Sequence, residues 1–437
     1  MQAEFSGGRA GQAPLTWGQR AIWTAIGRNP PGHFNIDLLL RVPRRDGIPL
    51  AEAVRAVGAL VERHESLRTR IRHAEGRLYQ DVASAGQVPV EVAEADAGAA
   101  ADVARSLLDG WAGADLDDGE RWPIRVGLVV ADGAVRWIAL LLSHVAADGR
   151  GSEIVLRDLR LLLRNGAIPA APGLQPLDLA RYQHSAGERR TRAAVAFWSS
   201  QYERLPSVMF TPDGPGDDPP HRRAQLTSPF FGAAIQAVAS RHKVSSAAVL
   251  LAATGTMVAR STGHPTVALT TIVGNRFDAQ LRPMVTSLDQ SGLFTIDLDD
   301  GPRFAELVPR AWRSALRAYR HAYYDSVRLE SALAELSRDR WSGRELMPYC
   351  CVNDVRRMAG EDALEAAAAE LPADPERAPV VWLDDPPPQR CHFCLQVSDG
   401  PGGLTLRLTA DTRCLPSPAM EDFLRGMEDL VLEAALT

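Results

Sequence analysis

The stretch Ser143-His144-Val145-Ala146-Ala147-Asp148-Gly149 holds the residue types in this chain that are best suited to chemistry. A histidine titrates near neutral pH, and its neutral ring can take a proton from an attacking amine or hydroxyl. Asp148 is placed to orient the loop, and Gly149 permits backbone conformations that other residues resist. Alone, the H-x-x-x-D-G pattern also fits an ordinary histidine in a strand-to-helix turn.

The residues on either side of this stretch predict the elements that hold it. The apolar run at 137–142 indicates a buried strand that ends just before His144. After Gly149, apolar residues recur at helical spacing, at Val155, Leu159, Leu162 and Leu163. The pattern therefore predicts a histidine delivered by a rigid strand into a tight loop, with a helix leaving from it.

Composition limits the class of protein. A chain of 437 residues is long for one core, so two subdomains are expected. The net charge of -6 argues against a nucleic-acid partner, which calls for a basic surface. The apolar window 129–147 contains Asp132, Arg136 and His144, which favours two strands joined at Asp132-Gly133 over a membrane span. Residues 1–14 lack the apolar core of a signal peptide, so we expect a cytoplasmic protein without a membrane partner.

The five cysteines do not form a metal-binding pattern. Cys391 and Cys394 have C-x-x-C spacing, but the adjacent Cys350 and Cys351 do not supply a second ligand pair at similar spacing. A redox pair usually opens a helix, whereas Cys394 lies in a strand-like run. Reduced thiols in the core, with no bound metal, are the interpretation that we favour; the fifth cysteine is Cys414.

The rest of the chain mixes helical patterns, alternating strands and hairpins. No glycine-rich phosphate loop follows any strand, and the mixture predicts an α/β fold, an α+β sandwich, rather than a parallel Rossmann sheet. Residues 166–176 form the best linker candidate. Helices are predicted at 16–23, 50–64, 101–111, 177–205, 232–242, 245–261, 303–322, 327–336 and 418–436, with an alanine-rich solvated helix or loose insertion at 361–370. Strands are predicted at 34–42, 67–82 (a hairpin turning at 75–76), 88–92, 124–130, 135–142, 266–273, 292–298, 347–352, 380–383, 392–398 and 404–410.

Two motifs together carry a family resemblance. Arg63-His64-Glu65-Ser66-Leu67-Arg68-Thr69 resembles the R-H-E-x-L-R-T motif of nonribosomal peptide synthetase condensation domains, and residues 143–149 resemble their H-H-x-x-x-D-G motif. The distance between the two motifs also fits. Further stretches that fit the family are Leu15–Trp23, Tyr182-Gln183, Phe197-Trp198, Gly274-Asn275-Arg276, Asp411-Thr412 and 420–432.

The resemblance implies a fold and a reaction. It implies two chloramphenicol-acetyltransferase-like subdomains, 1–175 with the His144 loop and 176–437, arranged as a V-shaped pseudo-dimer with a central tunnel. It implies no bound cofactor, because the acyl or aminoacyl group arrives as a thioester on the phosphopantetheine of a carrier protein. The acceptor would be an amine or alcohol, either a small molecule or carrier-bound. The product would be an amide or ester, as in antibiotic and other natural-product biosynthesis.

Roles for single residues follow from the same resemblance. His144 would be the catalytic base or would orient the nucleophile, and the Gly149 amide would meet the oxyanion. Asp148 would be structural and pair with Arg276 across the subdomain junction, since a buried carboxylate needs a partner. Arg150 and Arg157 are candidates for carrier contact.

Several positions depart from the family pattern. Ser143 replaces the first histidine of the H-H pair and would support His144 differently. The F-V-N-T segment is replaced by residues 287–293, and H-Q-D-x-P-F-E appears only as His321-Ala322-Tyr323-Tyr324-Asp325. The R-x-x-x-x-P motif is not recognisable, although Asn353 lies in the corresponding strand region as a candidate substrate contact.

These departures keep other functions open. A non-catalytic relative that recruits a partner protein is one alternative, although His144, Asp148 and Gly149 together argue against it. An acyltransferase that uses free acyl-coenzyme A is another, but the D-F-G-W-G segment of that group is absent. Epimerisation is a minor alternative, and heterocycle formation is disfavoured because His144 stands where cyclising relatives need aspartate. Without adenylation, carrier or thioesterase stretches, we expect a stand-alone or excised unit.

Overall fold

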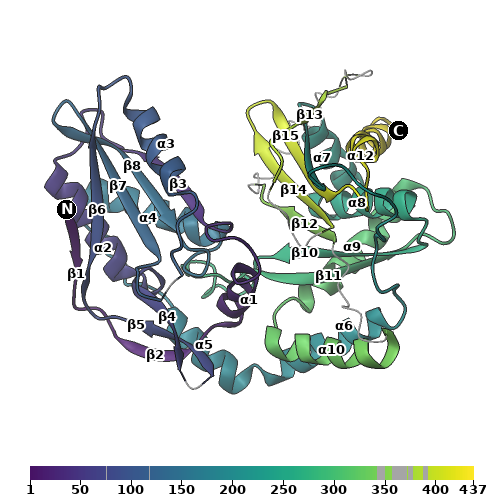
Figure 1. Cartoon of the computed structure of the whole chain (residues 1–437), viewed down its shortest axis with the longest axis horizontal. Helices are drawn as coiled ribbons and strands as arrows, with labels where there is room; N and C mark the ends of the chain where they lie inside the picture. Colours follow the sequence, from purple (N-terminus) through teal and green to yellow (C-terminus); the bar gives the residue numbers. More distant parts are fainter. Residues whose placement is uncertain (75, 118, 342–349, 357–371, 373–376, 387–391) are drawn as a thin grey trace. The chain divides into compact units, whose positions relative to one another are not determined.

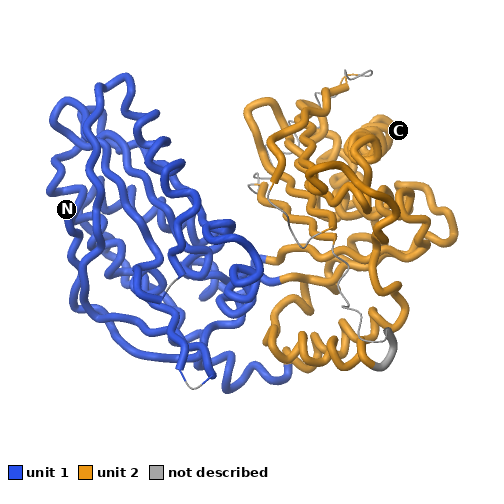
Figure 2. The backbone as a smooth tube through the Cα atoms, in the orientation of Figure 1, with its two compact units in different colours: residues 1–189, 274–290 blue, residues 190–273, 291–437 orange. Residues whose placement is uncertain are grey.

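The computed structural model describes the chain except for residues 75, 118, 342–349, 357–371, 373–376 and 387–391 (Figure 1). It divides into two compact units (Figure 2). Unit 1 comprises residues 1–189 and 274–290, and unit 2 comprises 190–273 and 291–437. This division differs from the predicted boundary between residues 175 and 176 in two respects. The chain up to residue 189 stays with unit 1, and a later segment returns to it.

Unit 1 is built around a five-stranded sheet in which alternate residues of the central strand face opposite layers. On β8 (Ala134–Leu142), Ile138 and Leu140 belong to the core that includes α2 (Leu50–Arg63) and α4 (Gly149–Asn165), whereas Ala139 and Leu141 pack with α3 (Ala100–Trp111). Because both faces are covered, the strand is apolar from Trp137 to Leu142. The sheet order is β1 (Gln2–Phe5), β6 (Gly86–Glu94), β7 (Ile124–Ala131), β8 and β3 (Ile36–Arg41).

A smaller sheet and three more helical elements complete the first part of unit 1. The three-stranded sheet runs in the order β2 (Gly11–Pro14), β5 (Arg77–Val82) and β4 (Thr69–Ala74). Helix α1 (Trp17–Ile26) begins with a capping box between Thr16 and Gln19, which satisfies the first amide groups of the helix. The other two are the 3-10 helix η1 (Glu65–Arg68) and α5 (Pro176–Ala186).

Unit 2 is built around a seven-stranded sheet with its core on one face. The inward residues of β15, such as Leu406 and Leu408, belong to a core that also contains residues of every described helix of the unit. The sheet order is β11 (Gln290–Asp297), β10 (Thr266–Val273), β12 (Cys350–Asp354), β14 (Phe393–Gly400), β15 (Gly403–Asp411), β9 (His221–Ser228) and β13 (Val380–Trp382). The helices are α6 (Glu188–Tyr202), α7 (Phe231–His242), α8 (Ser246–Thr262), α9 (Phe304–Arg320), α10 (Ser326–Trp341) and α12 (Ser417–Leu436).

The mixed α/β fold confirms the predicted class, and most of the predicted elements are present. The long helix predicted at 177–205 is instead two helices, α5 and α6, separated at Gly187. A Cβ at residue 187 would lie 2.4 Å from the Trp17 ring, so this close approach requires glycine. Strands β1, β2 and β9 were not predicted; β1 and β2 are four residues each and carry no apolar run. The alanine-rich stretch 361–370 and the first three residues of the strand predicted at 347–352 lie outside the described residues, and the other three open β12.

No single helix in the described part of the chain is both long and apolar enough to cross a membrane. Only α7 and α8 taken together meet that test, and they meet at an angle of 106°. Most of α8, from Ala248 to Val258, is buried within unit 2.

The segment 274–290 links β10 to β11 of unit 2 but packs with unit 1. Arg276 anchors it there, with Nη2 2.6 Å from Asp148 Oδ1 and Nη1 donating to the carbonyls of Leu281 and Met284 (2.9 and 2.8 Å). The Asp148 side chain is fully buried and that of Arg276 is 11% exposed. The ion pair expected between these two residues is therefore present. Through Asp148 it holds the segment 274–290 to the His144 loop, and the two carbonyl contacts fold the segment around Arg276.

Arg276→Ala should lower the free energy of unfolding by about 3 kcal/mol at pH 7, because it strands the buried Asp148 carboxylate. Urea unfolding followed by circular dichroism at pH 7 measures this, with Arg282→Ala, an exposed arginine of the same segment, as the control. An equal, small loss for the two variants would contradict a stabilising ion pair.

Candidate active site

The His144 loop joins an interior strand of the unit 1 sheet to a helix. Strand β8 pairs with β7 on one side and with β3 on the other, and its last residues, Leu140–Leu142, are buried. Six residues, 143–148, then lead to the first residue of α4, Gly149. A central strand and a long helix thus fix both ends of the loop, as the sequence pattern predicts.

Ser143, which replaces a histidine of the family motif, ties the loop to a neighbouring segment. Its hydroxyl donates to Asp117 Oδ1 at 2.5 Å and accepts from the Val145 amide at 3.1 Å. Its carbonyl accepts from the Ala146 amide at 3.0 Å. These bonds hold the main chain on both sides of His144. Asp117 was not predicted, because it lies in an irregular stretch with no recognisable motif.

The His144 ring is largely enclosed but remains partly accessible. The Phe34 ring lies edge-on to it, with 6.4 Å between the centroids. Burial lowers the pKa of His144 below its usual 6.5; the residue's own main chain and the Asp148 charge oppose this, less strongly. The ring nitrogen Nδ1 is buried and makes no regular hydrogen bond with the described residues. At neutral pH the ring is therefore uncharged, as a general base must be.

Asp148 is the N-cap residue of α4, and its carboxylate accepts hydrogen bonds from several donors. Oδ1 accepts from the Gly151 amide at 2.6 Å as well as from Arg276, and Oδ2 accepts from the Leu288 amide at 2.9 Å. Asp289 also faces this carboxylate; burial, and secondly the Asp148 charge, raise the pKa of Asp289 well above its usual value. Asp289 is thus a neutral acid that donates to Asp148. These hydrogen bonds give Asp148 a structural role in the loop.

Gly149 opens helix α4 next to the histidine. It is exposed, and its amide makes no hydrogen bond with the described residues, although its carbonyl accepts from the Ser152 hydroxyl at 2.7 Å. The first amides of a helix carry partial positive charge. An unbonded amide at this position suits the stabilisation of a developing oxyanion. A Cβ built on Gly149 would meet no atom within 4 Å, so a side chain there has room.

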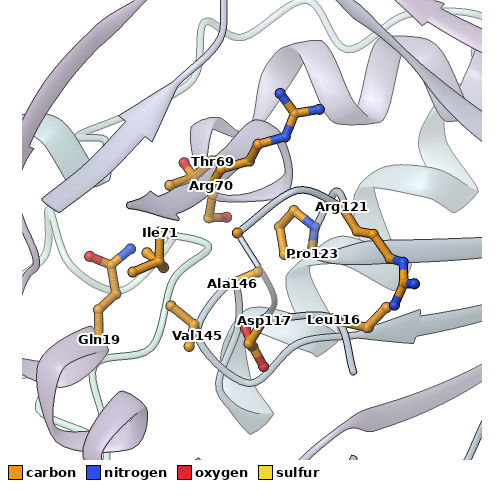
Figure 3. Close-up of a pocket in the computed structure, with 12 residues that line it drawn as sticks. Gln19, Thr69, Arg70, Ile71, Leu116, Asp117, Arg121, Pro123, Val145 and Ala146 are labelled. Atoms are coloured by element: carbon orange, nitrogen blue, oxygen red, sulfur yellow. The ribbon is translucent and has the colours of Figure 1, made fainter. Parts of the chain in front are cut away.

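A small cavity lies beside the loop (Figure 3). Val145 and Ala146 line it from the loop, with Gln19 and Ile71 on one side and Arg121 on the other. Its volume of about 10 Å³ is far too small for a substrate. It separates the loop from β4 rather than forming a binding pocket.

The residues predicted to contact a carrier lie on α4. Arg150 is 59% exposed and pairs with Glu153 at 2.5 Å, whereas Arg157 is 54% exposed and pairs with Asp158 at 2.7 Å. Asp158 is buried and is also bound by Arg63 and His64. The first family motif is therefore part of the ion-pair cluster under α4, so Arg157 has a structural role that Arg150 lacks.

Asn353 belongs to unit 2, whereas His144 belongs to unit 1. It is on β12, where it is partly exposed and stands opposite Gln396 of β14. Nothing in the described contacts brings it to the loop. Its role as a substrate contact stays a prediction.

One group of side chains in the described part of the chain has the donor types and spacing for a metal ion. The ligand atoms of His392, Asp411 and Cys414 lie within 4.8 Å of one another. Arg413 already binds the Asp411 carboxylate through Nε and Nη2, at 2.9 and 2.7 Å. Burial raises the pKa of Cys414 to about 11, which opposes the thiolate that a metal needs. Cys351 and Cys414 are free thiols, and Cys391 lies outside the described residues.

Comparisons with known proteins agree with these motifs. The chain is 28% identical over 327 residues, 70% of its length, to the probable non-canonical nonribosomal peptide synthetase CymA of Salinispora arenicola (strain CNS-205). It spans 4%, 28% and 13% of the lengths of the first three curated relatives.

Solved structures show the same fold. A structure described as the molecular basis for condensation domain-mediated chain release from the enacyloxin polyketide synthase matches with a TM-score of 0.73 and 20% identity, covering 99% of this chain and 84% of that one. The complex of the X-domain and OxyB from teicoplanin biosynthesis matches with a TM-score of 0.72 and 16% identity, covering 99% and 95%. The family model for the condensation domain matches residues 9–340, so this chain belongs to the condensation domain family.

Proposed function

We propose that this chain catalyses condensation: transfer of an acyl or aminoacyl group from a carrier-protein thioester to an amine or hydroxyl. The observation that carries the proposal is the pairing of a neutral, partly accessible His144 with the unbonded amide of Gly149, five residues away on one rigid loop. A base and an oxyanion donor are the two groups that acyl transfer requires.

The reaction follows from these groups. His144 accepts the proton of the acceptor's amine or hydroxyl as the nitrogen or oxygen attacks the thioester carbonyl. The carbonyl oxygen gains the negative charge, which the Gly149 amide stabilises. The carbon–sulfur bond then breaks, the carbonyl reforms as an amide or ester, and the pantetheine sulfur leaves as a thiol with the proton that His144 had accepted. Asp148, held by Arg276, keeps the loop in position without exchanging protons.

Two other functions have their own support. A non-catalytic, partner-recruiting role is favoured by the likeness to the teicoplanin X-domain and by the altered segment 287–293. Transfer from free acyl-coenzyme A would need the same base and oxyanion donor. We favour condensation because a role without chemistry gives no reason for an uncharged, accessible histidine beside an unbonded helix amide.

His144→Ala should lower kcat/KM by about a hundredfold or more in a single-turnover condensation assay, because the base is lost. In the unaltered protein the rate should fall as the pH drops through a value below 6.5, since protonation of His144 removes the base. His73→Ala, an exposed histidine on β4, is the matched control and should leave both measurements unchanged. Near-normal turnover by His144→Ala would overturn the assignment of His144 as the base, whereas no turnover by the unaltered protein would favour the non-catalytic role.

Replacing Gly149 by proline should remove the proposed oxyanion donor while keeping the helix. Proline is favoured at the first helical position, and Asp148 before it is extended, as a residue preceding proline must be. We expect Gly149→Pro to lower kcat about a hundredfold with little change in stability. Gly149→Ala keeps the amide and has space for its methyl group, so it should retain activity. Equal activity of the two variants would rule out the amide as an oxyanion donor.

We expect the acyl donor to be bound to a carrier protein. The kcat/KM for a carrier-protein thioester should be at least about tenfold higher than that for the same acyl group on free coenzyme A, a difference of about 1.4 kcal/mol in transition-state free energy. Arg150→Glu should weaken use of the carrier-bound donor more than use of a short soluble thioester, since Arg150 is exposed and carrier proteins are acidic near their phosphopantetheine.

Arg164→Glu, on the last turn of the same helix and about 20 Å away, is the control. Arg157→Glu is a poorer test than Arg150→Glu because it also disturbs the Asp158 cluster. Equal use of both donors would favour free coenzyme A.

A further inference from the structure

The unit 2 sheet has a second face that is polar. On β9, β14 and β15 the residues that alternate with the core positions mostly carry hydroxyl, amide or guanidinium groups. Arg223 and Arg407 are partly exposed, whereas Thr405 and Thr409 are buried. We call this the polar face; in its middle, Arg223 stands opposite Thr409 and Arg407 stands opposite Gln225. Its middle residues are Arg223, Gln225, Thr227, Cys394, Gln396, Ser398, Thr405, Arg407 and Thr409.

The two arginines of the polar face bind only neutral groups among the described residues. Arg407 donates to Gln225 Oε1 from Nε and Nη2 (3.3 and 3.1 Å) and to Gln396 Oε1 from Nη1 (3.4 Å). Arg223 donates from Nε to the Thr409 hydroxyl at 3.3 Å. Its two terminal nitrogens make no hydrogen bond with any described residue. Neither arginine forms an ion pair within the described part of the chain.

This arrangement is unfavourable without an anion. Burial and, secondly, the positive charge of Arg407 lower the pKa of Arg223. Half-buried like charges on adjacent strands repel one another, and partly buried charges are normally paired. The carboxylate at one end of the face, Asp411, is held by Arg413. Arg222, the chain neighbour of Arg223, by contrast has Asp385 at 2.8 Å.

We propose that Arg223 and Arg407 form a binding site for a small dianionic ligand, a phosphate monoester or a dicarboxylate. Guanidinium groups bind both through paired N–H donors, and two negative charges on oxygen balance the two cations. The hydroxyl of Thr409 and the amides of Gln225 and Gln396 position the two guanidinium groups. The site belongs to unit 2 alone and does not depend on His144 chemistry.

Titration calorimetry in low-salt buffer tests the site with inorganic phosphate, succinate and acetate as probes, because salt screens such contacts. Phosphate or succinate should bind with a Kd of about 1 mM or tighter, and the monoanion acetate at least about tenfold more weakly. Binding of phosphate alone identifies a phosphate site, and binding of succinate alone identifies a dicarboxylate site. Failure of both dianions to bind at about 10 mM would overturn the proposal.

Three variants assign the binding to these residues. Arg223→Gln and Arg407→Gln should each weaken the dianion at least about tenfold. Arg222→Gln removes the same charge from the neighbouring position of β9 and should change the Kd less than about twofold. Equal weakening by Arg222→Gln would overturn the proposal, since it would mean a general charge effect. Arg223→Gln should unfold at the same or higher urea concentration than the unaltered protein, because it removes a repulsion.

Discussion

The burial of one negative charge determines the arrangement of the candidate active site. The Asp148 carboxylate is stable without water only because main-chain amides, a guanidinium and a neutral carboxylic acid all donate to it. The Gly151 amide lies at the start of α4 and the other donors come from the segment 274–290, so satisfying the charge brings these two parts of unit 1 together. The geometry around His144 is a consequence of this requirement.

Neighbouring residues of the loop have different roles. Asp148 and Ser143 make structural hydrogen bonds. In contrast, His144 Nδ1 and the Gly149 amide have no hydrogen-bond partner among the described residues. Unsatisfied polar groups are costly where they are buried, and a rigid surrounding is needed to hold them. Ser143 bonds to Asp117 where the family motif has a histidine, so the support for the loop here comes from the hydroxyl–carboxylate contact.

Local pattern in the sequence was enough for most of the elements and for the loop. The apolar run of β8, the helical spacing of α4 and the capping residues of α1 each depend on neighbours in sequence. The family motifs led to Arg276 as the partner of Asp148. Asp117 and Asp289 were missed because their roles depend on contacts between distant segments that carry no motif. The roles of Arg150 and Asn353 depend on molecules that bind the protein, which neither pattern nor packing specifies.

The discontinuous make-up of unit 1 bears on the order in which the protein matures during synthesis. Unit 1 needs residues 274–290, so it cannot be completed when its first 189 residues leave the ribosome. By the time residue 290 emerges, α6, β9, α7, α8 and β10 of unit 2 have already been made. Until then the Asp148 carboxylate has no guanidinium partner, and the loop around His144 stays open to water. The first 189 residues alone would therefore form an incomplete unit 1. Unit 1 is completed only after part of unit 2 has been synthesised, so the two units do not fold one after the other.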